Sequence, residues 1–279
     1  MSKTNFINQL IVDIRINIIS KFYLYVPILV IIIFYCVSFL KDYNFALCIN
    51  EVNSKLSFGD YLFNIWKGEE IFSQNDLRDI FKMPSFITMY FLYNGFIICR
   101  YLNIKRSGNM CLYYIRNKSC YQWNTSKLIW CIINSFLYFI LTYSIIFLFA
   151  LFTGNQSLEI SEDITLSLNH VMFPAVNSEA VIFIIMPFLI LFSTALIQLF
   201  LSLLFRPIIA YVAIILIYVV SLFSCKSYFI YNYAMVLRLK IYDRQGVSLK
   251  NGILLNVVII SAVLFLYMIL SKRRKENFY

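Results

Sequence analysis

Residues 181–205 read VIFIIMPFLILFSTALIQLFLSLLF, an uncharged run that is longer than the roughly 20 apolar residues with which a helix crosses a bilayer. The composition of the chain agrees with it, because 61% of the 279 residues are hydrophobic and only 14% are charged. Ordinary soluble domains carry about 25% charged residues and have no core large enough for this much apolar surface. The sequence therefore predicts an all-α polytopic membrane protein.

Further apolar runs extend this prediction to six transmembrane helices within a single membrane domain, residues 1–279. The second run is the least regular, because its uncharged core is short and Arg100 must extend its long side chain to the interface. A re-entrant segment is the alternative for that run. We predict spans at residues 24–40, 84–100, 129–152, 181–205, 208–224 and 252–271.

The residues before the first span form a separate element. Apolar residues recur at helical spacing within residues 4–22, and most polar residues of this stretch fall on the other side of the helix. We expect an amphipathic helix that lies in the membrane interface. Its apolar positions are Phe6, Ile7, Leu10, Ile11, Ile14 and Ile18.

The charge distribution orients the six spans. With six spans both termini share one side, and that side carries 14 of the 24 Lys and Arg residues but only two of the 14 acidic residues. Basic residues concentrate on the cytoplasmic side of membrane proteins, so we place both termini in the cytoplasm. The exception is loop 225–251, which is basic although this layout places it outside. The net charge of +10 has this origin, and no nucleic-acid-binding motif accompanies it.

The cysteine and histidine content speaks against a disulfide framework and a metal site. Seven cysteines is an odd number, and their spacing matches no known framework. Only Cys48 and Cys225 can both face outward in this layout, which leaves a disulfide between them open. His170 is the single histidine, so no histidine-based metal site is expected.

The sequence lacks the motifs of most enzyme classes. No two of the seven glycines have the spacing of a phosphate-binding loop, so the chain has no recognisable ATPase motif and we expect no enzyme activity of its own. Acidic pairs within the spans, which ion-coupled pumps use, are also missing. A membrane enzyme that acts on lipids or prenyl groups remains an alternative, with Glu69, Asp76 and Asp79 as its candidate residues.

The spans contain polar but uncharged residues in two regions. They suit a cleft for an amphipathic or lipid-like cargo, and they equally suit hydrogen bonds that hold helices together. The sequence leaves both options open. These residues are Tyr138, Thr142, Tyr143, Ser193, Thr194, Gln198 and Ser202.

A basic segment separates the second and third spans. Residues 111–127 read CLYYIRNKSCYQWNTSK, in which the charges of Arg116 and Lys118 alternate with aromatic rings such as Tyr121 and Trp123. Arginine and aromatic side chains are frequent anchors of protein interfaces. An aromatic belt with positive-inside anchors is the simpler alternative. It does not explain why this connection between two spans is so long, since a short turn at Arg206 connects two other spans on the same side.

The order of these parts resembles an ABC-transporter permease of the type-2 export class. In that resemblance the segment from Arg116 to Lys127 is the coupling helix that docks on a separate ATPase subunit. Residues 58–62 (FGDYL) and 66–68 (WKG) look like the outer-loop pattern of small antibiotic- and bacteriocin-export permeases of Gram-positive bacteria, and residues 232–238 like their re-entrant segment. The implied coupling residues are Arg116, Asn117, Lys118, Tyr121, Trp123 and Lys127.

The resemblance also implies partners and a cargo. Two permease chains, identical or homologous, would enclose a cleft in the bacterial plasma membrane, and ATPase subunits that bind ATP and Mg would drive export. The cargo would be an antimicrobial peptide, a hydrophobic drug or a lipid-linked molecule. The alternative is an immunity or accessory protein that binds an antimicrobial peptide in the membrane without ATP.

Overall fold

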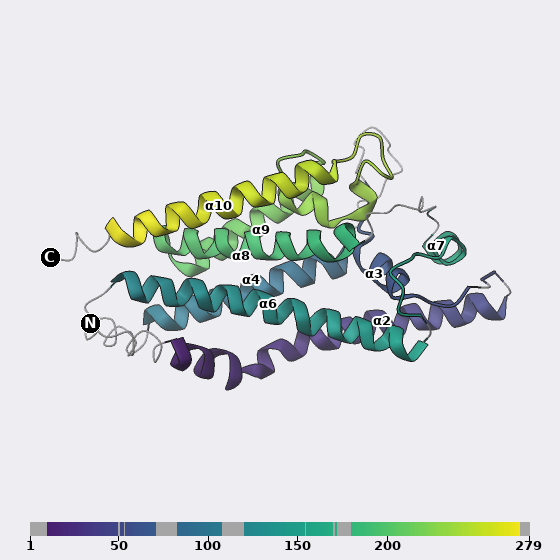
Figure 1. Cartoon of the computed structure of the whole chain (residues 1–279), viewed down its shortest axis with the longest axis horizontal. Helices are drawn as coiled ribbons and strands as arrows, with labels where there is room; N and C mark the ends of the chain where they lie inside the picture. Colours follow the sequence, from purple (N-terminus) through teal and green to yellow (C-terminus); the bar gives the residue numbers. More distant parts are fainter. Residues whose placement is uncertain are drawn as a thin grey trace.

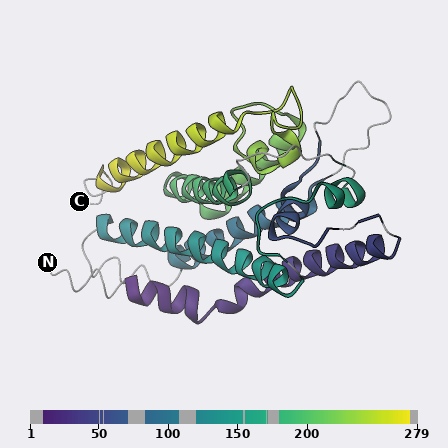
Figure 2. The same ribbon diagram turned by 45° about the vertical axis from the view of Figure 1, so that its right-hand side comes forward.

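The computed structural model describes residues 10–49, 51–52, 54–70, 83–107, 120–153, 155–169, 171 and 180–273. These residues are predominantly helical, and no strand occurs among them beyond two isolated bridges. The long helices lie side by side in an elongated bundle (Figures 1 and 2). The predicted all-α architecture is confirmed for this part of the chain.

Each predicted span corresponds to a long helix. These are α2 (Val26–Cys48), α4 (Ser85–Ser107), α6 (Cys120–Thr153), α8 (Met186–Leu204), α9 (Pro207–Phe223) and α10 (Leu249–Arg273). Shorter elements lie between them: η1 (Arg15–Ile19), η2 (Phe22–Tyr25), α3 (Phe58–Trp66), α7 (Glu162–Asn169), η3 (Val181–Ile185), η4 (Ile230–Ala234) and η5 (Val236–Arg238).

Within the described ranges, four helical stretches are long and apolar enough to cross a membrane, which gives the chain the character of a membrane-embedded protein. They are Phe22–Cys48, Asn124–Thr153, Val181–Leu204 and Leu249–Leu270. Helix α9 is apolar but shorter, with 17 residues. Helix α4 has the length of a span but is less apolar than the others, because it carries Asn94, Arg100 and further basic residues.

Several helices extend beyond the predicted spans. Helix α2 continues to Cys48, past Lys41 and Asp42, and α6 begins at Cys120 rather than at residue 129. A charge ends the stretch that hydrocarbon can cover, but it does not end the backbone hydrogen bonding of a helix. The predicted spans at residues 24–40 and 129–152 are therefore shorter than the helical stretches that contain them.

The two ends of the bundle differ. The first described turns, the start of α6 and the last turn of α10 lie at one end, which we call the terminal end. Helices α3 and α7 lie at the opposite end, which we call the far end (Figures 1 and 2).

The helical turns from residue 10 to Ile19 lie within the predicted interfacial helix, of which residues 4–9 fall outside the described residues. Asp13 and Asn17 are buried against the bundle, whereas Ile11 and Ile19 are exposed. Of the predicted apolar positions, Ile18 is also buried, Leu10 and Ile14 are half-buried and Ile11 is exposed, so this face packs largely against protein and not outward. The opposite side carries the exposed apolar residues Ile11, Val12, Ile16 and Ile19, which suit contact with lipid.

Polar side chains connect the long helices inside the bundle. The hydroxyl of Tyr25 donates to Asn134 Oδ1 at 2.6 Å, and Asn134 Nδ2 donates to Asn94 Oδ1 at 3.3 Å. Ser193 Oγ on α8 donates to Asn256 Oδ1 on α10 at 2.7 Å. All of these side chains except that of Tyr25 lie on the long helices, so the bonds fix how neighbouring helices face one another.

The far end is closed by two short inserts that we call the far-end plug, α3 together with residues 230–238. Helix α3 begins at a capping box, in which Ser57 Oγ accepts from the Asp60 amide and Asp60 accepts from the Ser57 amide. The chain leaves α3 through Gly68, whose φ of 71° favours glycine and whose added Cβ would lie 2.6 Å from Met235 Cβ. The amide of Leu237 donates to the carbonyl of Lys67 at 3.0 Å, which joins the two inserts.

Arg238 ties the plug to α9. Its side chain is 2% exposed, and its guanidinium donates to the carbonyls of Ser221 at 2.7 Å and Leu222 at 2.8 Å, in the last turn of α9. It also donates to Asn232 Oδ1 at 2.8 Å and to the Glu69 carbonyl at 3.2 Å. A cation at a helix C-terminus is stabilised by the unpaired carbonyls there. Burial lowers the pKa of Arg238 from its ordinary value.

Arg238→Gln is expected to lower the free energy of unfolding by about 2–4 kcal/mol, because it removes charge-assisted bonds and leaves buried carbonyls without donors. Thermal unfolding in detergent, followed by near-ultraviolet circular dichroism, measures the change. Arg244→Gln is the matched control, since Arg244 is exposed in the same loop and its loss should stay within about 0.5 kcal/mol. Equal unfolding midpoints for the two variants would contradict this role of Arg238.

Candidate functional site

Part of the predicted coupling segment lies within the described residues. Arg116, Asn117 and Lys118 lie outside them, and Tyr121 and Trp123 lie in the first turns of α6, where only the backbone is described. Lys127 follows on α6 and is half-buried. The helix thus begins inside the predicted coupling segment and carries its C-terminal part continuously into the bundle.

A buried carboxylate lies beside this start of α6. Asp13 is 2% exposed, and its Oδ2 accepts from Ser126 Oγ on α6 at 2.7 Å and from the Tyr101 hydroxyl on α4 at 3.4 Å. Buried carboxylates require such donors, because desolvation of the charge is otherwise unfavourable. The N-terminal element is thereby bonded to α4 and α6 at the terminal end, close to where the basic segment leaves one helix and enters the other.

Further contacts hold the same turn of α6. The rings of Tyr101 and Trp130 are stacked at 3.6 Å between centroids, and the Tyr267 hydroxyl of α10 donates to the Asn124 carbonyl at 2.8 Å. Helices α4, α6 and α10 and the N-terminal element therefore meet at one point. We call this point the basal clasp, and it consists of Asp13, Tyr101, Asn124, Ser126, Trp130 and Tyr267.

The residues predicted to line a cleft are buried inside the bundle, apart from Ser202, which is half-buried. Tyr138 donates to the Tyr90 carbonyl on α4 at 2.8 Å, and Gln198 donates to the Gly95 carbonyl at 2.8 Å. Tyr143 donates to the Phe183 carbonyl, and Ser193 donates to Asn256 as described above. Those four side chains connect different elements, as the helix-joining alternative expects. Bonds to carbonyls of their own helices are made by Thr142, Thr194 and Ser202.

Three buried hydrogen-bond donors in this part of the described structure make no well-aligned hydrogen bond. They are Trp66 Nε1 on α3, the Tyr90 hydroxyl on α4 and the Tyr231 hydroxyl on η4, and all three side chains are 1% exposed or less. We call them the buried donor cluster. An unsatisfied buried donor costs about 1–3 kcal/mol, and native proteins retain few of them.

The buried donor cluster lies against three of the predicted cleft residues. The Thr142 hydroxyl lies beside that of Tyr90, and the Thr194 hydroxyl lies beside that of Tyr231. The Tyr143 hydroxyl lies beside the Trp66 indole. Each of these three neighbouring oxygens can accept a loosely aligned hydrogen bond from the donor next to it. Aromatic contacts join the donors, since the rings of Trp66 and Tyr90 lie 5.1 Å apart. The sequence does not distinguish these donors, because an aromatic residue among apolar neighbours has the same appearance whether it packs inside or faces lipid.

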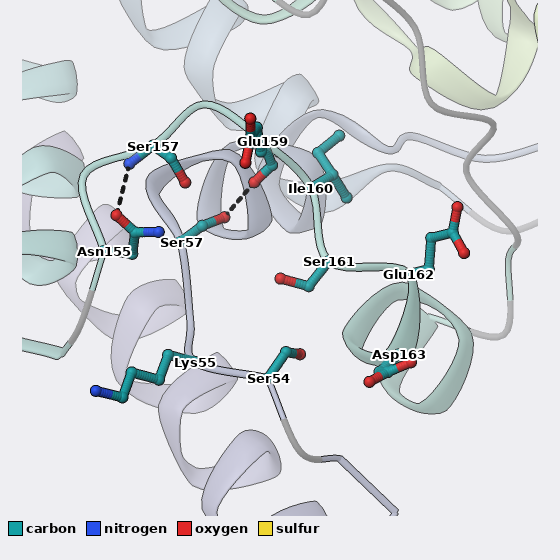
Figure 3. A pocket seen from close by; sticks show the side chains of 10 residues that line it. All are labelled: Ser54, Lys55, Ser57, Asn155, Ser157, Glu159, Ile160, Ser161, Glu162 and Asp163. Atoms are coloured by element: carbon teal, nitrogen blue, oxygen red, sulfur yellow. Dashed lines mark hydrogen bonds between the residues drawn. The ribbon is translucent and has the colours of Figure 1, made fainter.

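The far end also has a surface cavity of about 300 Å³. Its walls come from two segments, residues 54–57 and 155–163, which are joined by the bond from Ser57 Oγ to the Glu159 carbonyl at 2.6 Å (Figure 3). Three of its lining residues are acidic and one is basic, so its potential favours a cationic ligand. The lining residues are Ser54, Lys55, Ser57, Asn155, Ser157, Glu159, Ile160, Ser161, Glu162 and Asp163.

Asp60 holds the two walls of this cavity together. Its Oδ1 accepts from the Ser161 amide at 2.8 Å, and its Oδ2 accepts from Ser57 Oγ at 2.8 Å and Ser161 Oγ at 3.1 Å. Burial raises the pKa of Asp60, although the hydrogen bonds from Ser161 and Ser57 act in the opposite direction. Asp60 is therefore a structural carboxylate of the far end.

The alternative of a membrane enzyme gains no support from this region. Asp76 and Asp79 lie outside the described residues, and the backbone carbonyl of Glu69 accepts a bond from Arg238. Within the described ranges no group of three His, Cys, Asp or Glu residues is placed to hold a metal ion. Cys48 and Cys225 are both free thiols in the structure.

Comparisons with protein-family models, with characterised proteins and with solved structures find no match to this chain. Its function is therefore inferred from the geometry of its own residues.

Asp13→Ala is expected to release the N-terminal element from the basal clasp. Ser126 and Tyr101 lose their shared acceptor, so amide hydrogen exchange in residues 10–20 should accelerate about tenfold or more, while exchange within α8 stays the same. Exchange measured by mass spectrometry in nanodiscs gives the result. Ser20→Ala is the control, because Ser20 Oγ bonds within its own element, to the Ile16 carbonyl. Equal acceleration of exchange in both variants would contradict the role of Asp13 in holding the N-terminal element.

Proposed function

We propose that this chain is the membrane-spanning permease subunit of an ATP-driven exporter of the ABC type-2 class. In this proposal it moves a hydrophobic or amphipathic cargo out of a bacterial cell, and a separate ATPase subunit binds ATP and Mg and supplies the energy. The observation that carries the proposal is the basal clasp. It joins the start of α6, and with it the basic segment, to three other elements of the bundle.

The clasp supports this role for a mechanical reason. A force applied to a mobile loop moves only that loop. A force applied to a helix that packs against its neighbours moves the helix and its neighbours together. Helix α6 runs from Cys120 to Thr153 without interruption, from the terminal end towards the far end (Figure 1). A force on Arg116–Trp123 would thus reach α4 and α10 through Tyr101 and Tyr267, and the far-end plug through α6.

The proposal includes six spans with both termini in the cytoplasm of a bacterium. Helix α9 joins the four longer apolar helices as a span because its rise of 1.5 Å per residue gives about 25 Å, close to the thickness of the hydrocarbon core. Helix α4 is packed between other helices, which shields its polar residues from lipid, and its basic residues Arg100, Lys105 and Arg106 lie at the cytoplasmic end in this layout.

A second permease chain is part of the proposed assembly. Only 11% of the most apolar stretch of α10 is buried within this chain, and Leu254, Val257 and Phe265 are exposed on it. Such a face suits a neighbouring permease or lipid. The ATP-independent immunity or accessory protein is the alternative, and the acidic cavity at the far end suits its binding of a cationic peptide. Association with an ATPase separates the two.

Arg116→Glu combined with Trp123→Ala is expected to reduce recovery of an ATPase chain at least tenfold when the protein is purified in mild detergent, because both interface anchors are lost. The ATPase is recognised by mass spectrometry through its phosphate-binding loop. Arg244→Glu is the control, since it makes the same charge reversal at the far end. If wild-type protein never recovers an ATPase, the accessory-protein alternative replaces this proposal. If the double variant recovers as much as wild type, the coupling role of these residues is wrong.

The topology is expected to place Cys120 inside the cell and Cys48 outside. An impermeant maleimide on intact cells should label a variant that retains only Cys48, which is exposed, and should spare a variant that retains only Cys120. Inverted vesicles should show the opposite pattern. Labelling of Cys120 on intact cells would refute the proposed orientation and with it the ATPase-coupling role.

A further inference from the structure

We propose that Arg100 and Tyr23 bind the phosphate of an anionic phospholipid at the terminal end of the bundle, with the acyl chains of that lipid along the outer faces of α2 and α4. We call these two residues the headgroup site. Such a site is independent of the proposed export function, because it requires only that the chain is embedded in a membrane.

The short helix η2 is held on the surface of α4 at two points. Tyr93 of α4 donates to the Leu24 carbonyl at 2.7 Å, and Arg100 Nη2 donates to the Tyr23 hydroxyl at 3.2 Å. Tyr93 and Arg100 are seven residues apart, so they lie on one face of α4 about two turns from each other. The Cζ atom of Arg100 lies 5.9 Å from the centre of the Tyr23 ring, which suits a cation over an aromatic face. The guanidinium is therefore held in a defined place.

The charge of Arg100 has no counterion in the described part of the chain. Its single hydrogen bond there goes to a neutral hydroxyl, whereas the guanidinium of Arg238 is enclosed by four acceptors. A guanidinium has several further N–H donors, and the Tyr23 hydroxyl still has its own proton to donate. Polar groups at the surface of the hydrocarbon need a partner, so Arg100 and Tyr23 together offer donors to an anionic oxygen.

The side chains around the headgroup site indicate a lipid. Phe22, Tyr23 and Val26 are 44%, 57% and 45% exposed, and Phe96, one turn before Arg100 on α4, is 42% exposed. An arginine at the end of a span extends along such an apolar surface to the level of the headgroups. Exposed aromatic rings are also frequent at that level. The phosphate of a lipid is the anion that a membrane provides there.

The charge of the N-terminal element favours an anionic lipid over a zwitterionic one. Lys21 is half-buried at the start of η2, and Arg15 is exposed on the same element. Neither side chain forms an ion pair within the described ranges. Asp13, the single acidic residue before the first span, is buried in the basal clasp. The surface is therefore positively charged, and such a surface attracts anionic lipid.

Titration with lipid tests the headgroup site. The purified chain in detergent is titrated with phosphatidylglycerol or with phosphatidylcholine, and bound lipid is counted by native mass spectrometry. Wild type should bind phosphatidylglycerol more tightly than phosphatidylcholine. Arg100→Gln should weaken binding of phosphatidylglycerol about tenfold, because charge-assisted hydrogen bonds to the phosphate are lost. Arg100→Lys should weaken it as well, because an ammonium lacks the planar pair of donors.

Arg206→Gln is the matched control. Arg206 is exposed in the turn between α8 and α9, and the Cys99 thiol donates to the Pro207 carbonyl at 3.5 Å, which places this turn beside the same end of α4. The variant removes the same charge but leaves the headgroup site intact, so it should keep its affinity within about twofold. An equal loss in Arg100→Gln and Arg206→Gln would assign the effect to diffuse surface charge and overturn the proposal.

Tyr23→Phe tests the site without a change of charge. It keeps the ring and the guanidinium but removes one donor to the phosphate, so binding of phosphatidylglycerol should weaken about threefold. Unchanged affinity in both Tyr23→Phe and Arg100→Gln would overturn the proposal, and so would equal affinity of wild type for the two lipids. Displacement of bound phosphatidylglycerol by excess inorganic phosphate would show a site for a free anion and overturn the assignment to a lipid.

Discussion

The structure depends on buried polar side chains that bond to one another within a bundle whose core and outer surface are both largely apolar. Large apolar residues such as Phe34 and Phe152 point outward, at 69% and 87% exposed, whereas Asn94, Asn134 and Asn256 are buried. In hydrocarbon no solvent satisfies a polar group, so each must find a partner inside the protein. The cross-helix bonds follow from this constraint, and they determine which face of each helix meets its neighbour.

The same constraint gives the two ends of the bundle different constructions. At the terminal end the carboxylate of Asp13 is buried under hydroxyls from α4 and α6. At the far end the guanidinium of Arg238 is buried under carbonyls from α9 and from the connection that follows α3. Each of these two side chains joins segments that are distant in the sequence. Movement at one end can therefore reach the other only through the long helices between them.

The longest helices were predictable because their apolar runs reach the length that a bilayer requires, and the run at residues 181–205 shows this most plainly. The ends of α2 and α6 were not predictable in this way. Lys41 and the residues that follow Cys120 belong to helical segments that extend beyond the hydrocarbon. Helix α3 was treated as part of a loop, although Ser57 and Asp60 have the spacing of a capping box. Of the predicted cleft residues, Tyr138 and Gln198 lie inside the bundle as bonds between helices, a distinction that depends on the partner across the interface.

Local composition by itself determined that the chain is helical and membrane-embedded, because hydrophobicity and helix length are properties of consecutive residues. Tertiary structure alone decided which polar residues meet. Nothing near Asp13 in the sequence points to Ser126, and nothing near Tyr138 points to the carbonyl of Tyr90 to which it donates. Hydrogen bonds between distant segments depend on how helices rotate and pack, and that arrangement is a property of the whole bundle.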